Sequence, residues 1–260
     1  MTQKTSSVIA QQILVLLATI GTIGINALAN TIPLNGYTTG AVSNSIPMFF
    51  VPAGYVFLIW SLIYVSLIAF SIYQILPAQR INNKQFMMIR LWYVLSCLAN
   101  GVWIVLWHYL YIGYSVLAML ILLGSLIFVY FNIKQKNNNR VIKNRAERWL
   151  LAAPFSLYLG WITVATIANI SAALTFYHWD GFGLSGELWT AIMLAIATVI
   201  TVSNITKHRD IIYGLVIIWA FIGIVVKFPN IIMVAYTAAA MIVIMLITLF
   251  RTAIHHRPLQ

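Results

Sequence analysis

The chain has 260 residues, of which 62% are hydrophobic and 7% are charged, and its mean hydropathy is +0.93. A soluble domain carries roughly a quarter charged residues, so the composition excludes a soluble globular protein and predicts an all-α integral membrane protein. The net charge of +11 does not indicate nucleic-acid binding, because the basic residues lie in short loops between apolar runs, as the positive-inside rule expects. The only cysteine, Cys97, permits no intrachain disulfide and no cysteine-based metal cluster.

Eight apolar runs are long enough to cross a hydrocarbon core of about 30 Å. If the N-terminus is inside, fourteen of the fifteen Lys and Arg residues fall on the inner side and only Lys227 falls outside. This bias predicts that both termini are cytoplasmic, in a plasma or inner membrane. The predicted spans lie near 8–30, 54–76, 89–111, 113–132, 149–177, 187–206, 211–227 and 230–251, and the seventh of them is short.

The first span has a second interpretation. Lys4, an apolar run and the small residues of Ala27-Leu28-Ala29 resemble a signal peptide with a cleavage site. However, Asn26 interrupts the run just before that site, and the next segment is another span rather than an exported domain. We therefore expect the first span to be retained, and cleavage is the alternative.

The segment between the first two spans, residues 31–53, reads TIPLNGYTTGAVSNSIPMFFVPA and carries no charge. Its Gly, Pro, Ser, Thr and Asn residues are typical of turns. We therefore expect an ordered or partly ordered lid on the outer side, rather than a helix.

Three spans carry aromatic residues on one helical face, because spacings of three and four residues bring side chains to the same side of a helix. From the helical rise, the central tryptophan of each stripe lies in the outer half of the bilayer, beneath the lid. One interpretation is helix–helix packing, with asparagines bonding across helices; the other is a cleft for a flat hydrophobic ligand with a polar edge. The candidate ligand-binding residues are Phe57, Trp60 and Tyr64, then Asn100, Trp103 and Trp107, then Tyr158, Trp161, Ala165 and Asn169.

Other tryptophans lie at span ends, where an aromatic belt is expected without any further function. These are Trp92, Trp149, Trp179 and Trp189.

The remaining segments divide the chain into two units. The inner loop 133–148, IKQKNNNRVIKNRAER, is basic and is predicted to lie near anionic lipid headgroups rather than to bind nucleic acid. KFPN at 227–230 predicts a tight turn between the last two spans. Because these last spans do not echo the first five, we expect a five-helix bundle over 1–177 and three additional helices over 178–260.

The span interiors hold no Asp, Glu, Lys or Arg at depth. Ion-coupled carriers and voltage sensors place ionisable groups there, so we expect no proton or sodium coupling. The outer residues His178, Asp180 and Glu187 are interpreted as interface residues rather than as a cation site. We expect no metal, no resident cofactor and no catalytic residue, because no Ser-His-Asp or paired-carboxylate pattern is visible.

The segments PAGYVFLIWSLIY, ANGVW and YLGWITVATIAN resemble the translocator-protein family, also called tryptophan-rich sensory proteins, TspO/MBR or peripheral benzodiazepine receptors. That family carries W-x-x-x-Y in its second helix, N-x-x-W in its third, and Y-L-x-W followed by Ala and Asn in its fifth. The order and spacing fit a five-helix bundle over roughly 8–177, about two-thirds of the chain. The matching residues are Trp60, Tyr64, Asn100, Trp103, Tyr158, Leu159, Trp161, Ala165 and Asn169.

The chain also departs from that pattern. Where the family usually has Pro before the Tyr of its fifth helix, this chain has Leu157, and where the family has Phe before the Ala, it has Val164. The step from Gly54 to Trp60 is one residue shorter than usual, and the last three spans have no counterpart in the resemblance. We therefore interpret the chain as a divergent, elongated relative.

The resemblance implies a bundle that binds a porphyrin or other tetrapyrrole, a haem-like or a sterol-like molecule in a pocket under residues 31–53, acting as a sensor or an uncoupled carrier. The partners it implies are the lipid bilayer and a small hydrophobic ligand, with a homodimer left open. One alternative is an enzyme that degrades a bound tetrapyrrole, with Trp60, Trp103 and Trp161 as oxidisable rings. Another is a structural or regulatory partner of a second membrane protein, contacted through the last three spans.

Overall fold

The computed structural model describes residues 2–79, 84–134 and 145–254. For residues 2–6 and 84–85 it describes the backbone alone. Within these ranges the regular structure is helical and contains no strand. The helices are α1 (Thr2–Thr31), α2 (Thr39–Ser45), α3 (Ile59–Ile75), α4 (Lys84–His108), α5 (Ile112–Lys134), α6 (Arg145–Glu147), α7 (Ala153–Phe176), α8 (Gly186–His208), α9 (Ile211–Lys227) and α10 (Ile232–Ile254).

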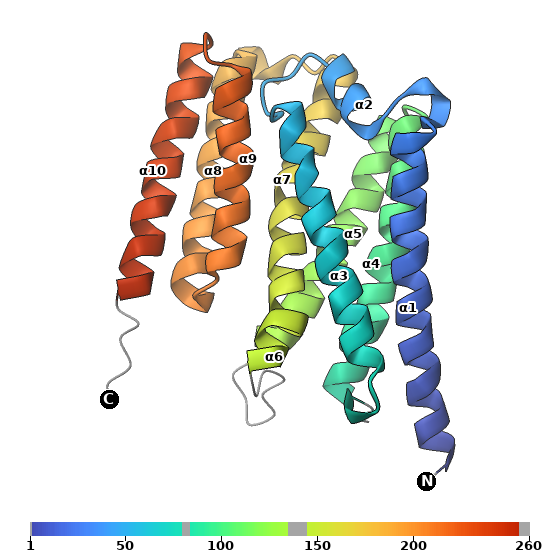
Figure 1. Cartoon of the computed structure of the whole chain (residues 1–260). Coiled ribbons are helices and arrows are strands. Elements are labelled where there is room, and N and C mark those ends of the chain that lie inside the picture. The colour runs from blue at the N-terminus through green and yellow to red at the C-terminus, as the bar shows by residue number, and fades with distance from the viewer. Residues whose placement is uncertain (1, 80–83, 135–144, 255–260) are drawn as a thin grey trace.

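The long helices form two groups that lie side by side (Figure 1). In the first group, α4 packs between α1 and α5, and α7 packs against α5 and α3. In the second group, α8, α9 and α10 pack against one another, and α9 contacts α7. The helix α2 lies across one end of the first group, called the lid end here, whereas α1 begins and α10 ends at the opposite end, called the termini end (Figure 1).

Seven helices of the described residues are long and apolar enough to cross a membrane, which confirms the all-α membrane fold and seven of the eight predicted spans. The eighth, α9, is apolar but has 17 residues, a length of roughly 26 Å at the usual helical rise. Its short length has two local causes. Asp210 caps its first turn by accepting a hydrogen bond from the Tyr213 amide at 3.1 Å, and Pro229 follows directly after its last turn.

The lid prediction is wrong in one respect, because residues 31–53 contain the short helix α2. The Thr38 side chain caps this helix by accepting a hydrogen bond from the Ala41 amide at 3.2 Å, and such a cap satisfies an amide that the first turn leaves open. The lid is also bonded to α4. Trp107 Nε1 donates to the Thr39 carbonyl at 3.2 Å, and the Asn35 amide donates to the His108 carbonyl at 3.1 Å.

A close backbone approach joins the two groups at the lid end. The turn Gly54–Leu58 precedes α3, and the neighbouring Ala53 amide donates to the Gly223 carbonyl of α9 at 3.0 Å. A Cβ on Gly223 would lie 2.9 Å from the Cβ of Pro52 and would collide with the Val56 side chain. Only glycine fits here. Trp219 Nε1 adds a second bond by donating to the Val56 carbonyl at 3.1 Å.

A buried carboxylate joins the two groups at the termini end. Asp210, 3% exposed, accepts hydrogen bonds from the hydroxyls of Tyr130 at 2.8 Å and Ser156 at 2.6 Å. Its Oδ2 also lies 3.1 Å from the Nζ of Lys134. We call these four residues the Asp210 latch, because they connect the start of α9 to α5 and α7.

Arg90, at the inner end of the predicted span 89–111, is more deeply enclosed than a basic residue of an inner loop would be. It lies in the second turn of α4 and is 1% exposed. Its guanidinium donates to Gln74 Oε1 at 3.2 Å and to the Gln79 carbonyl at 2.8 Å, and it lies over the Phe86 ring. A buried charge requires such partners. The other basic loop, predicted at 133–148, lies mostly outside the described residues.

Candidate functional site

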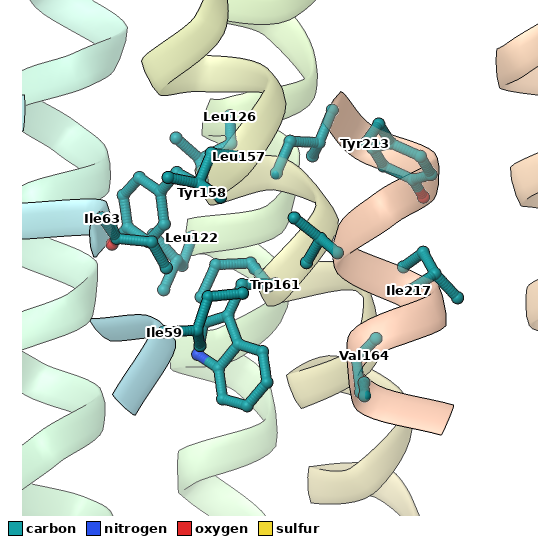
Figure 2. Packing of buried hydrophobic residues seen from close by; sticks show 14 of the residues in the cluster. Ile59, Ile63, Leu122, Leu126, Leu157, Tyr158, Trp161, Val164, Tyr213 and Ile217 are labelled. Carbon is teal, nitrogen blue, oxygen red and sulfur yellow. The ribbon is translucent and has the colours of Figure 1, made fainter. Parts of the chain in front are cut away.

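The aromatic stripes of α3 and α7 meet at Trp60. Its ring lies 6.0 Å from that of Tyr158 and 6.1 Å from that of Trp161, both edge-on, and it stacks on Tyr64 at 5.4 Å. Phe57 packs edge-on against Trp161 at 5.7 Å. Edge-on and offset rings are the favoured geometries of aromatic pairs. Figure 2 shows Tyr158 and Trp161 projecting from α7 on the side of Ile59 and Ile63 of α3, with Ile217 of α9 on the other side.

The stripe of α4 forms a second wall of the same region. Trp103 and Trp107 stack with ring centroids 5.9 Å apart. Trp103 Nε1 donates to Asn169 Oδ1 at 3.0 Å, and the Asn169 amide donates to the Ser115 hydroxyl at 2.9 Å. Asn169 therefore bonds across helices, as the packing interpretation predicts, and holds Trp103 in place at the same time.

A small cavity lies between these walls and beneath the lid. Its free volume is about 40 Å³, which accommodates only a few waters, since one water needs roughly 10–15 Å³ on this scale. Seven of the ten candidate residues line it. The lining residues are Phe57, Trp60, Trp103, Trp107, Trp161, Ala165 and Asn169, together with Thr39, Ser43, Met48, Pro52, Val164 and Ala168.

The structure places the other three candidates outside this cavity. Tyr64 lines a larger groove of about 670 Å³ between α1, the lid and α3. Phe57 and Trp60 line both the groove and the cavity and thus separate them. Tyr158 lies behind Trp60, and the Asn100 Oδ1 accepts a hydrogen bond from the Asn26 amide at 2.6 Å. That bond is another contact of the packing kind.

Three buried hydrogen-bond donors lack a partner of good geometry within the described ranges. They are the Nδ2 of Asn100, the hydroxyl of Tyr158 and the Nε1 of Trp161. The side chains of Asn100 and Tyr158 lie close enough to interact with each other, whereas Trp161, 3% exposed, lines the cavity. A buried polar group without a partner costs roughly 1–3 kcal/mol, and native proteins rarely leave one. The Trp161 indole can therefore donate a hydrogen bond to a bound molecule.

Sequence reasoning missed six of the lining residues for two reasons. Val164 and Ala168 follow Trp161 by three and seven positions and so belong to the same helical face, but small side chains give no signal of their own. Thr39, Ser43, Met48 and Pro52 come from the lid, whose course over the bundle no local pattern predicts. Among the described residues, no group of three or more His, Cys, Asp or Glu side chains could hold a metal ion, and this applies to the outer trio His178, Asp180 and Glu187.

The helices and this cavity define a class, a multi-pass, all-α membrane protein with a small aromatic cavity near its lid end. The comparison with protein families is more specific, because the family described as TSPO-like protein matches residues 12–251. With nearly the whole chain matched, the protein belongs to the TSPO-like family, as the motifs of the second, third and fifth spans predicted. No curated protein and no solved structure gives a match.

The matched region is longer than the region that carried the resemblance. It continues past residue 177 through α8 and α9 and reaches residue 251 within α10. The last three helices, which had no counterpart in the motifs, therefore lie inside the part of the chain that matches the family.

Proposed function

We propose that the protein binds a flat, hydrophobic ligand with hydrogen-bond acceptors on its edge, of the porphyrin, tetrapyrrole or sterol-like kind, in the aromatic cavity. It then acts as a sensor or an uncoupled carrier of that ligand. The observation that carries the proposal is the Nε1 of Trp161, a buried donor without a partner on the wall of the aromatic cavity. Packing alone explains the bonded pairs Trp103–Asn169 and Asn26–Asn100, but it gives no reason for leaving this donor unpaired.

The size of the cavity adds a requirement. A free volume of about 40 Å³ is far below the roughly 300–1,000 Å³ of typical ligand pockets. Binding of a flat macrocycle therefore requires Phe57 and Trp60 to move, so that the cavity joins the groove of about 670 Å³ on their other side. Phe57 and Trp60 are both only partly buried, and neither takes part in the lid bonds of Trp107 and Asn35.

The proposal includes an orientation. With the lid end outside and the termini end cytoplasmic, the basic residues obey the positive-inside rule. Lys227 is then the one outer basic side chain of the described residues, and its Nζ donates to Asn44 Oδ1 in the lid at 2.6 Å. The ligand would reach the cavity from the outer half of the bilayer.

The deciding experiment is porphyrin titration of the purified protein followed by tryptophan fluorescence. Trp161→Ala and Trp103→Ala should each weaken binding several-fold, because stacking on one aromatic side chain is worth on the order of 1 kcal/mol. Trp149→Ala is the control, since Trp149 is 60% exposed at the termini end. If the two cavity variants lose thermal stability but bind as tightly as the control, the stripes serve packing and the proposal fails.

The same preparation separates binding from catalysis. A sensor or carrier returns the porphyrin unchanged after illumination, whereas an enzyme of the alternative kind converts it into products that depend on the protein. Absorbance spectra of the extracted pigment, compared with those of Trp60→Phe protein and of buffer, distinguish the two outcomes.

A further inference from the structure

A second cavity lies at the junction between the five-helix group and the last three helices, and we call it the junction cavity. It has a free volume of about 210 Å³ and lies between residues 47–50, the lid end of α7, the turn before α8 and the first turns of α8. Met48 lines both this cavity and the aromatic cavity. Nothing in the proposed function uses the junction cavity.

Aromatic side chains form much of its wall. Trp179 and Trp189 line it, with ring centroids 5.0 Å apart and planes tilted by 54°. Phe49 and Phe50 line it as well, and Phe49 packs edge-on against Phe228 of the α9–α10 turn at 5.5 Å. From the sequence, both tryptophans are expected in an interfacial belt. In the structure they line the same cavity.

The backbone holds this wall in position. Trp189 Nε1 donates to the Gly181 carbonyl at 2.8 Å. Gly181 has φ +66° and a Cβ on it would lie 3.0 Å from that nitrogen, so both the conformation and the contact require glycine. The neighbouring Asp180 lines the cavity too. Its Oδ1 accepts a hydrogen bond from the Phe182 amide at 3.1 Å, which restricts the position of the carboxylate in the wall that it shares with the two indoles.

The charge at this end of the molecule has the sign opposite to that of the whole chain. Two carboxylates, Asp180 and Glu187, and one ammonium, Lys227, lie at the lid end of the described residues, whereas the chain as a whole carries +11. Indole faces attract cations through their quadrupole, and an adjacent carboxylate adds to that attraction. An apolar wall, two indoles and one carboxylate favour a cation with apolar substituents over an anion or a neutral polar molecule.

We propose that the junction cavity binds an organic ammonium ion. Quaternary ammonium groups are the ligands that clusters of aromatic side chains recognise best. The ion can be a free amine or the choline headgroup of a lipid, because the cavity lies at the lid ends of the apolar helices α7 and α8. The proposal is independent of the aromatic cavity and of its ligand.

The test uses a matched pair of probes on the full-length protein in uncharged maltoside micelles. Choline and its neutral isostere 3,3-dimethylbutan-1-ol have the same shape, and saturation-transfer NMR measures the dissociation constant of each. We expect choline to bind more tightly than the alcohol. Asp180→Asn keeps the acceptor oxygen for the Phe182 amide but removes the charge, and it should weaken choline binding about two- to five-fold without changing the affinity for the alcohol.

Two further variants test whether choline binding depends on the residues that line the junction cavity. Glu187→Gln removes the same charge from a residue that does not line the cavity, and it should leave both affinities unchanged. Trp179→Leu keeps an apolar wall and should weaken choline binding several-fold while the thermal stability stays close to that of the parent. Equal affinities for choline and the alcohol, or an equal effect of Glu187→Gln and Asp180→Asn, would overturn the proposal.

The source of the ion is settled by adding a zwitterionic phosphocholine lipid to the micelles at a fixed ratio. If the lipid lowers the apparent affinity for choline in the parent protein, the headgroup is a ligand of the cavity. If the affinity is unchanged, the cavity binds the free ion and excludes the lipid.

Discussion

Tyr158 and Trp161 each carry a buried polar atom without a well-formed hydrogen bond. Phenylalanine can replace either residue, which removes the polar atom and keeps an aromatic ring. Tyr158→Phe deletes a buried hydroxyl that makes no hydrogen bond of good geometry, although the Asn100 side chain lies near it. The ligand-free variant should therefore be as stable as the parent or more stable by up to roughly 1 kcal/mol. The affinity for a ligand with an acceptor edge should fall about two- to ten-fold, because one hydrogen bond to the ligand is lost.

Trp161→Phe makes the same test one helical turn further along α7, with the ring wall largely kept. Thermal melting and porphyrin titration of both variants, with Tyr236→Phe on the exposed face of α10 as the control, check the expectation. A rise in stability without a loss of affinity would show that the unpaired donors never meet the ligand.

The sequence predicted which side chains lie together on one helix face, but it did not predict their hydrogen bonds. Period and residue type placed Trp60, Trp103 and Trp161 together, because a stripe at helical spacing has to face a neighbouring helix when its residues are too large and too polar for lipid. The pattern does not distinguish Asn169, whose polar atoms are bonded, from Tyr158, whose hydroxyl is not. That difference depends on atoms from other helices.

Among the helices, the contact of α9 with the turn before α3 depends on the missing side chain of Gly223. Gly223→Ala raises the intrinsic helix propensity of α9 by roughly 1 kcal/mol, yet it should destabilise the protein by about 1–3 kcal/mol, because the added methyl collides with Pro52 and Val56. Gly24→Ala in α1 is the matched control, since no atom lies within 4 Å of a Cβ there. Thermal melting in detergent compares the two.

A neutral or stabilising Gly223→Ala would mean that α9 and the turn before α3 are further apart than the structure has them. The two substitutions add the same methyl group to a helical glycine, so their difference measures the contact and not the change in helix propensity.

The Asp210 latch gives a second prediction for the same helix. Asp210→Ala leaves Lys134 without its carboxylate and the Ser156 hydroxyl without its acceptor, and it leaves the Tyr130 hydroxyl with Asn204 Oδ1 alone. Breaking a buried pair in this way typically costs about 3–5 kcal/mol, so the melting temperature should fall well below that of the parent. Asp180→Ala, which removes a carboxylate from an exposed turn, should have a much smaller effect.

The sequence predicted the long apolar helices and their approximate bounds, because a membrane span requires an apolar run of a definite length. Each predicted run agrees with its helix to within a few residues. The short helix α2 was missed for the opposite reason. Its seven residues, TGAVSNS, have low helix propensity and are interpreted locally as turns, and only the Thr38 cap and the contacts with α4 select the helix.

For the whole molecule, the orientation in the membrane is a prediction that the basic residues make. Cysteines placed at positions 44 and 138 of a Cys97→Ser protein should react differently with an impermeant reagent added to intact cells. Position 44 in the lid should be labelled from outside and position 138 only after the membrane is permeabilised. Labelling of position 138 from outside would reverse the proposed topology.

Transport, where it occurs, should be independent of proton and sodium gradients. The buried acidic and basic side chains of the described residues are Arg90, Glu147 and Asp210 near the termini end and His108 at the last residue of α4. Arg90, Asp210 and His108 are bonded to neighbouring groups, and all four lie near helix ends, whereas coupling sites lie within the membrane, on the path of the substrate. Uptake of a porphyrin into proteoliposomes should not change when either gradient is collapsed. Accumulation against a concentration gradient that depends on protons would point to Arg90 or Asp210 as a coupling group.

The Asp210 latch also has a consequence for how this chain can change over generations. Deletion of the later helices would remove the carboxylate that Lys134, Tyr130 and Ser156 contact. A shortened descendant would lose all of these contacts in one step, whereas a substitution on a later helix changes few of them. We therefore expect relatives to vary the side chains on α8 to α10 more readily than they lose the helices.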